Sequence, residues 1–597
     1  MKDFLKTTLA TVVGILIAGI VFTVLGIVTL SGMLMNSQPE TIVKDNSIFV
    51  LELKGNVVER YQENPLDQLL GDEYTTTGLD DILASIRKAK ENDKIKGIYL
   101  DFDLLFSCGT ASLQEIRQAL VDFKNCGKFI VAYGGNYTQS AYYLASVADK
   151  VALNPSGTIS WHGLSAQSIF LKDLLDKIGV QMQIFRVGTY KSYTETFSST
   201  EMSPANREQT QAYVQSIWQQ ILADVAASRD LTPEQLNELA DSCMDFRQAD
   251  YCLRNGLADT LVYKDQLLSY LKQRMDVEED DKLNTLSLED MINVKRNVPK
   301  DKSGNIVAIY YATGDIDSTT DPDPTEGINS EQVIKDLQRL RKDETVKAVV
   351  LRVNSPGGSA YGSEQIWREV SLLKAEKPVI VSMGDYAASG GYYISCAADW
   401  IVAEPTTLTG SIGIFGMVPE ASELINNKLG IHMDGVKTNR LADMGQIDRP
   451  LSNEEKALIQ QSVNNGYELF TKRCAEGRKM PIEQLKEIAE GRVWSGNMAK
   501  ELKLVDALGS LQDALNEAVK RAEITDYTVL SYPEKENILS SLLNTKKDSY
   551  IDSKLEATFG EYFHGFALLK NLKQTDRIQL IADGRSLVRL ISDSQKP

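Results

Sequence analysis

The stretch from residue 380 to 405 reads IVSMGDYAASGGYYISCAADWIVAEP, and it decides the fold because an earlier stretch of the chain repeats it. That earlier stretch, residues 130–155, reads IVAYGGNYTQSAYYLASVADKVALNP. Aligned without gaps, the two share a tyrosine pair, an aspartate (Asp149 and Asp399) and a final proline. Similarity that holds one register over such a length is the signature of an internal repeat.

The repeat extends well beyond these two stretches. Upstream, KGIYLDFD (from Lys96) matches KAVVLRVN (from Lys347), and downstream KIGVQM matches KLGIHM and NGLADTLVYKDQL matches LKLVDALGSLQDAL. These separated blocks keep the same order and nearly constant spacing, which chance similarity explains poorly. We therefore predict two copies of one domain, over residues 46–275 and 304–525.

Each copy alternates strand-like and helix-like segments. In the second copy the β-branched run VKAVVLRVN precedes the amphipathic EQIWREVSLLKAE, and the strand-like PVIVSMG and WIVAEP flank another helical segment. This alternation indicates an α/β fold with crossover helices. Between the copies, residues 276–303 include the acidic VEEDDKLNTLSLED, which we interpret as a linker or peripheral helix. Residues 526–597 lack a counterpart in the first copy, look partly helical, and are expected to form an interface or capping element.

The N-terminus carries a long apolar segment. Residues 9–30 read LATVVGILIAGIVFTVLGIVTL, which exceeds the roughly 20 apolar residues that span a bilayer. Lys2 and Lys6 precede it, so the positive-inside rule predicts that the N-terminus stays in the cytoplasm. We expect residues 1–36 to be a single-pass anchor in the cytoplasmic (inner) membrane, with the body on the periplasmic, extracytoplasmic side. The alternative is a cleaved signal peptide, although no convincing cleavage site follows the apolar run.

Composition narrows the possible function classes. The net charge is −18, with 82 acidic against 64 basic residues, and this balance argues against nucleic acid as a partner. The six cysteines are scattered without a C-x-x-C pair, the three histidines form no H-E-x-x-H motif, and we expect no metal. Neither the G-x-x-x-x-G-K-[ST] nor the G-x-G-x-x-G phosphate-binding motif occurs, and no cofactor is expected.

Two glycine-rich turns follow predicted strands of the second copy. They are N-S-P-G-G at 354–358 and A-A-S-G-G at 387–391, the latter opening a helix. A serine at a helix N-terminus lies beside unpaired backbone N–H groups, which can stabilise an oxyanion. Taken alone, A-A-S-G-G is equally consistent with small-residue helix packing, and N-S-P-G-G is more often only a tight turn. Their occurrence on successive strand ends of one domain favours a serine nucleophile with a two-donor oxyanion hole.

A serine nucleophile needs a base. The three histidines are poor candidates by position, since one lies in a strand-like segment, one in a turn of the first copy and one beyond both copies. Carboxylates are normally too weak to deprotonate a serine hydroxyl. A lysine can serve when burial lowers the pKa of its amine from about 10.4 towards neutrality, which leaves lysine as the expected base type.

The motifs NSPGGSA, MGDYAASGGYYIS, LTGSIGIFG, GRVWSG and FRVGTYKSYTETF together resemble peptidase family S49. The likeness is to the long, double-domain signal peptide peptidase A type, whose members are Ser/Lys peptidases of the ClpP/crotonase-like superfamily. It implies an α/β protein made of tandem duplicated ClpP/crotonase-like domains behind an N-terminal transmembrane helix. By similarity, the site consists of Ser389 as nucleophile, Lys191 as general base, Ser411 as the residue that orients the lysine, and the backbone N–H groups of Gly390 and of Gly358 (or Gly357) as the oxyanion hole.

The repeat alignment is consistent with these assignments. Ser389 of the second copy aligns with Gln139 of the first, which cannot act as a nucleophile, and Lys191 aligns near Ala442, which cannot act as a base. Each copy has therefore kept one component, and neither should be active alone. The sequence leaves open whether the lysine meets the serine of its own chain or of a neighbour.

The resemblance also implies a substrate and an assembly. It predicts a membrane-bound serine endopeptidase that degrades cleaved signal peptides at the outer face of the cytoplasmic membrane and that assembles as a homotetramer. One alternative is a catalytically inactive, membrane-tethered peptide-binding scaffold, although an inactive protein would not need both the Ser/Lys set and the glycine turns. The shared superfamily also suggests crotonase-type acyl-CoA chemistry, but the expected location away from cytoplasmic CoA argues against it.

Overall fold

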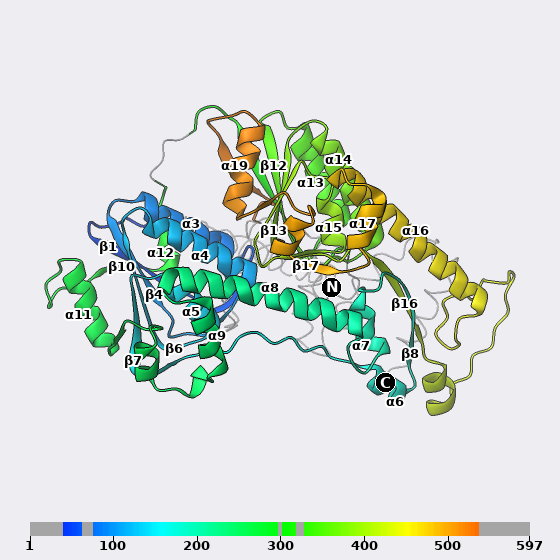
Figure 1. Cartoon of the computed structure of the whole chain (residues 1–597). Coiled ribbons are helices and arrows are strands. Elements are labelled where there is room, and N and C mark those ends of the chain that lie inside the picture. Colours follow the sequence, from blue (N-terminus) through cyan, green and yellow to red (C-terminus); the bar gives the residue numbers. More distant parts are fainter. Residues whose placement is uncertain (1–39, 62–75, 297–300, 318–326, 536–597) are drawn as a thin grey trace, which may run out of the picture. The chain divides into compact units, whose positions relative to one another are not determined.

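The computed structural model describes residues 40–61, 76–296, 301–317 and 327–535 (Figure 1). The predicted membrane anchor (residues 1–36) and most of the predicted C-terminal extension lie outside the described residues. Among the helices of the described part, none has the length and apolar character that a membrane span requires.

The first copy is built on a sheet of six parallel strands in the order β10-β1-β4-β6-β7-β9. Its central strands are almost fully buried, as expected for a parallel sheet covered on both faces. The strands are β1 (Ser47–Glu52), β4 (Ile95–Asp101), β6 (Phe129–Tyr137), β7 (Lys150–Ile159), β9 (Thr260–Leu261) and β10 (Asn284–Leu286). The helices are α3 (Leu79–Glu91), α4 (Thr110–Lys124), α5 (Gln139–Ala145), α9 (Pro233–Asp241), α10 (Ala249–Arg254), α11 (Lys264–Arg274) and α12 (Leu288–Asn293).

The second copy repeats this arrangement in an eight-stranded sheet. Its order is β17-β15-β13-β12-β11-β19, with β14 beside β13 and β18 beside β14, and every pair is parallel except β15 with β17. The strands are β11 (Ile306–Thr313), β12 (Val346–Ser355), β13 (Val379–Ala388), β14 (Trp400–Ala403), β15 (Leu408–Gly410), β17 (Val493–Ser495), β18 (Ala507–Leu508) and β19 (Thr528–Tyr532). The helices are α13 (Ser330–Lys342), α14 (Ala360–Lys374), α15 (Gly390–Ser395), α16 (Asn453–Arg478), α17 (Ile482–Ile488), α18 (Gly496–Glu501) and α19 (Leu511–Arg521).

Local sequence explains these elements. The run that forms β12 is β-branched and apolar, and its residues are buried almost throughout. Helix α14 begins after Ser359, whose side chain accepts a hydrogen bond from the Gly362 N–H and so caps the helix. Ile366, Val370 and Leu373 follow at helical spacing and are buried against the sheet, so a single apolar stripe holds the helix in place.

The boundaries of the two copies differ from the prediction at their C-terminal ends. Strand β10 pairs with β1, so part of the predicted linker 276–303 is the edge strand of the first sheet, followed by helix α12. In the same way β19, within the predicted extension 526–597, pairs with β11. The extension therefore does begin with a counterpart of a first-copy segment. Both strands were missed because they are short edge strands without a long apolar run.

Several elements join the two copies. Strand β8 (Gln181–Val187) of the first copy and β16 (Ile414–Glu420) of the second lie side by side as an antiparallel ribbon (Figure 1). Helix α8 (Pro204–Arg229) of the first copy contacts β17 of the second, where Ser216 and Ser495 share a hydrogen bond of 2.7 Å. Shorter elements complete this region: β2 (Gly55–Val58), β3 (Thr76–Gly78), β5 (Phe106–Ser107), α6 (Lys172–Ile178) and α7 (Glu195–Ser198).

Candidate active site

Ser389 lies at the junction between strand β13 and helix α15. Its backbone has φ 54° and ψ −117°, a conformation that non-glycine residues rarely adopt and that occurs most often at functional sites. Two hydrogen bonds of 2.9 Å hold it there: the Ser389 N–H donates to the Gly410 carbonyl, and the Tyr393 N–H donates to the Ser389 carbonyl. The side chain is therefore presented by a sharp strand-to-helix turn of the second copy.

Lys191 comes from the first copy, in the loop that follows strand β8. The residue is only 4% exposed, and its Nζ lies 3.0 Å from Ser389 Oγ. The same Nζ lies 3.0 Å from Ser411 Oγ and donates to the Ser411 carbonyl at 2.9 Å. The structure thus brings the three predicted side chains together within one chain, although Lys191 and Ser389 are 198 positions apart.

Burial lowers the pKa of Lys191 to about 7, because a charged amine is poorly solvated inside the protein. A neutral amine has two N–H bonds and one lone pair. With both N–H bonds directed to the Ser411 oxygens, the lone pair remains for the Ser389 hydroxyl proton. The arrangement can therefore act as a nucleophile with an adjacent general base near neutral pH.

Two glycines of the second copy cover the stem of Lys191. A Cβ on Gly491, whose φ is +74°, would lie 2.7 Å from Lys191 Cβ, and a Cβ on Gly413 would lie 3.3 Å from Lys191 Cδ. The first position requires glycine both for its backbone conformation and for this close approach. Gly491 is the first residue of the GRVWSG motif, so that motif packs against the backbone and the first side-chain carbon of the base.

The loop that carries Lys191 is fixed by a residue that the sequence analysis did not identify. The carbonyl of Glu490 accepts a hydrogen bond from the Tyr190 N–H at 2.9 Å. The Glu490 carboxylate accepts two more from Thr189, at 2.6 Å from the hydroxyl and 3.2 Å from the N–H. Glu490 of the second copy, which belongs to neither side of the Ser389–Lys191 pair, therefore fixes the backbone that leads to Lys191.

The N-S-P-G-G turn lies directly against the start of helix α15. Gly357 and Gly358 have φ values of +113° and +147°, and a Cβ on Gly357 would lie 2.7 Å from the Gly390 nitrogen. The Gly357 N–H already donates to Ser355 Oγ at 3.2 Å. Within the described residues the N–H groups of Gly390 and Gly358 have no protein acceptor. Of the two alternatives left by the sequence, Gly358 is therefore the better oxyanion donor beside Gly390.

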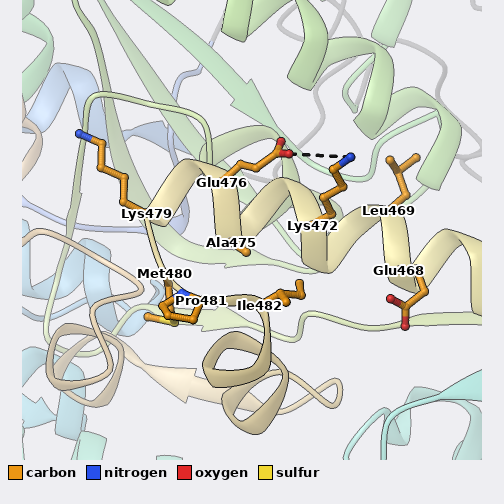
Figure 2. Close-up of a pocket in the computed structure, with 9 residues that line it drawn as sticks. All are labelled: Glu468, Leu469, Lys472, Ala475, Glu476, Lys479, Met480, Pro481 and Ile482. Carbon is orange, nitrogen blue, oxygen red and sulfur yellow. Dashed lines mark ion pairs between the residues drawn. The ribbon is translucent and has the colours of Figure 1, made fainter.

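One surface pocket, of about 620 Å³, borders the loop of the base, because Gly188 and Thr189 are among its lining residues. A pocket of about 830 Å³ lies beside the end of α16 and the start of α17, lined by apolar groups such as Met480 and Ile482 (Figure 2). The ion pair between Lys472 and Glu476, 4.0 Å long, lies on its rim (Figure 2). None of its lining residues belongs to the Ser389 region, and the hydrogen-bonded geometry locates the chemistry better than the size of a cavity does.

Comparison with known proteins agrees with this geometry. The sequence model of peptidase family S49 matches residues 122–278 and 371–525, one match in each copy, and the Clp protease model matches residues 322–403. The chain belongs to peptidase family S49. It is similar to Protease 4 of Salmonella typhi, with 36% identity over 515 residues that cover 84% of this chain and 82% of the relative.

Two further relatives extend the comparison. The chain is 33% identical over 486 residues to the chloroplastic serine protease SPPA of Arabidopsis thaliana, covering 81% of this chain and 70% of the relative. It is 39% identical over 208 residues to a putative signal peptide peptidase SppA of Enterococcus faecium, covering 35% of this chain and 60% of the relative. This S49 peptidase is thus a serine protease of the long SppA type, with tandem duplicated S49, ClpP-like domains.

Proposed function

We propose that this S49 peptidase hydrolyses peptide bonds through an acyl-enzyme on Ser389, with Lys191 as general base. The observation that carries the proposal is the 3.0 Å approach of the two side chains in a site where the amine is buried. Neutral Lys191 takes the hydroxyl proton as Ser389 Oγ attacks the peptide carbonyl. The resulting oxyanion accepts hydrogen bonds from the N–H groups of Gly390 and Gly358.

The second half of the reaction uses the same groups. The ammonium of Lys191 returns its proton to the leaving amine as the peptide bond breaks, which leaves an ester on Ser389. Neutral Lys191 then takes a proton from a water molecule that attacks the ester. Collapse of the second oxyanion releases the carboxylic acid, and the proton on Lys191 returns to Ser389 Oγ. Ser411 keeps the amine directed at the serine throughout, since its two oxygens bind the amine N–H groups.

The pH dependence of hydrolysis should follow the neutral form of Lys191. Because its pKa is lowered to about 7, kcat/KM should rise with pH, reach half its plateau near pH 7, and stay high above that. The measurement is kcat/KM for a peptide substrate between pH 5 and about pH 10 at constant ionic strength. A half-maximum near pH 10 would show a fully hydrated lysine, and activity that falls as pH rises through 7 would contradict a lysine base.

We also propose that the substrates are remnants of cleaved signal peptides and that the body lies outside the cytoplasm at the inner membrane. The apolar, uncharged run at residues 9–30 behind Lys2 and Lys6 supports a single-pass anchor with its N-terminus inside. A tethered enzyme would meet apolar leader peptides where they are released. The name of the Enterococcus faecium relative supports the same substrate class. Protease accessibility of the body in spheroplasts, compared with intact cells, tests the location.

The experiment for the reaction uses the full chain in detergent with two synthetic peptides, an apolar leader sequence and a polar peptide of equal length. The wild type should cleave the leader peptide much faster, and Ser389→Ala should cleave neither. Ser395→Ala is the matched control, because Ser395 lies in helix α15, which begins directly after Ser389, and its hydroxyl donates to the Gly391 carbonyl at 2.6 Å. Cleavage by Ser389→Ala would contradict the mechanism, whereas equal cleavage of both peptides would contradict the substrate alone.

For the assembly, we propose a homotetramer in which the segment 421–447 contacts a second copy of the chain. This segment leaves several large apolar side chains in solvent, namely Leu429 (59% exposed), Ile431 (51%), Met433 (62%) and Val436 (104%). Such a concentration of exposed apolar groups is typical of an interaction surface. The mass of the full chain in detergent, measured by light scattering with the detergent contribution subtracted, tests the proposal, and a monomer would contradict it.

A further inference from the structure

Helix α8 of the first copy carries a buried glutamine beside the base. Gln209 is 2% exposed and lies between the loop of Lys191 and strand β17 of the second copy. Among the described residues, the Gln209 side chain forms no hydrogen bond with Lys191 Nζ or with Ser389 Oγ. It is therefore a candidate for setting geometry rather than for taking part in proton transfer.

The amide of Gln209 holds the base on both sides. Its Nε2 donates to the Tyr190 carbonyl and to Ser192 Oγ, both at 2.9 Å, and these residues directly precede and follow Lys191. Its Oε1 accepts a hydrogen bond from the Val493 N–H at 3.1 Å. One buried side chain thus binds two points of the first copy and one of the second, all three at partly buried positions.

Strand β17 connects this contact to the nucleophile. Val493 pairs with Gly410 in the antiparallel β15–β17 ladder, and the Gly410 carbonyl accepts the hydrogen bond from the Ser389 N–H. The neighbouring Arg492 carbonyl accepts a hydrogen bond of 2.7 Å from the Ser411 N–H. Strand β17 and the residue directly before it therefore contact the segments that carry both serines around the lysine amine.

We infer that Gln209 is a positioning residue that fixes the distance between Lys191 and Ser389 and keeps the amine dehydrated. The inference rests on the dyad proposed above. Its chemical basis is that a carboxamide supplies two N–H donors and a carbonyl acceptor at once, which this junction uses together. An apolar side chain of similar size would fill the space but leave the Tyr190 carbonyl and the Val493 N–H unpaired, and the loop would shift to regain water.

The test compares Gln209→Met with Gln220→Met. Gln220 is a matched control because it lies on the same helix and also bridges the copies, its Oε1 accepting from Asn497 Nδ2 at 3.1 Å, but it does not touch the base loop. For Gln209→Met, kcat should fall on the order of 100-fold with little change in KM, as expected for a small misplacement of reacting groups. The half-maximum of kcat/KM should also move to higher pH, because a more hydrated lysine regains a higher pKa. Gln220→Met should keep the wild-type half-maximum.

The pH profile separates positioning from a purely structural role. A loss of folded protein lowers the amplitude of the kcat/KM profile but leaves the pH of its half-maximum unchanged. Titration with a serine-directed fluorophosphonate gives the concentration of active sites and so corrects for that loss. If Gln209→Met does not fold, Ser192→Ala removes one acceptor at a partly buried position and should shift the half-maximum in the same direction by less. A wild-type half-maximum in the folded variant would overturn the inference.

The dyad and the positioning role can fail separately in this assay. If Lys191→Met or Ser389→Ala retains hydrolysis, the proposed dyad is wrong. If both are inactive while Gln209→Met has the wild-type kcat and profile, only the positioning role of Gln209 is wrong.

Discussion

Replacing Lys191 by methionine is expected to lower kcat/KM for peptide hydrolysis by at least about 10⁴-fold while leaving the fold intact. Methionine has nearly the shape of the lysine stem, so it should fill the space beside Gly491 and Gly413. It removes the only side-chain nitrogen that approaches Ser389 Oγ among the described residues. Hydrolysis and the melting temperature Tm are measured on the same preparation. Tm should change little, because removing a buried group that can be charged offsets the loss of the two hydrogen bonds to Ser411.

Lys128→Met is the matched control for this prediction. The amine of Lys128 is also partly desolvated, which lowers its pKa, and it donates to the backbone carbonyls of Ala89, Lys90 and Asn92 at 2.7 to 3.0 Å. It serves only the first copy's structure, so its loss should lower Tm and leave kcat/KM close to that of the wild type. A Lys191→Met variant that loses no more activity than Lys128→Met would contradict the assignment of the base.

The fold was predictable where the sequence repeats itself. The central strands β12 and β13 are nearly continuous apolar runs, and their counterparts β4 and β6 recur at the same spacing in the first copy. The strand pattern of each copy therefore supported the strand prediction in the other. The edge strands β10 and β19 were missed for a physical reason. An edge strand is held mainly by backbone hydrogen bonds to one neighbour, so N-T-L in β10 needs no apolar pattern to pair with β1.

The candidate site was predictable only in part. Ser389 and the glycine turns are local signals, because a tight strand-to-helix turn requires small residues at adjacent positions. Lys191 needed a family resemblance, since nothing in its own neighbourhood distinguishes it from a solvated lysine. Gln209 and Glu490 gave no signal at all. They are polar residues in polar segments, and only the contact between the two copies makes them part of the site.

A buried charge cluster also lies between the copies. Arg352 of β12 is fully buried and donates two hydrogen bonds of 2.9 Å to Glu59 of the first copy. Its third nitrogen lies 2.6 Å from Glu115 of α4, also of the first copy. One guanidinium therefore faces two carboxylates, and burial raises the pKa of Glu115 to about 7. Glu59 further accepts a hydrogen bond of 3.1 Å from Asn354, the first residue of the N-S-P-G-G turn.

Arg352→Met should therefore lower the free energy of unfolding by about 3–5 kcal/mol, because Glu59 and Glu115 would stay buried without a cation. Urea midpoints and Tm measure the loss. The triple variant Arg352→Met, Glu59→Gln, Glu115→Gln should recover much of it, since none of these three positions then carries a buried charge. Arg254→Met is the control: the side chains of Arg254 and its partner Asp250 are 68% and 60% exposed, and the loss of this pair should cost under about 1 kcal/mol. If both single variants lost the same free energy of unfolding, water would have to reach the Arg352 cluster. The junction beside the N-S-P-G-G turn would then be stabilised by apolar packing instead of by this cluster.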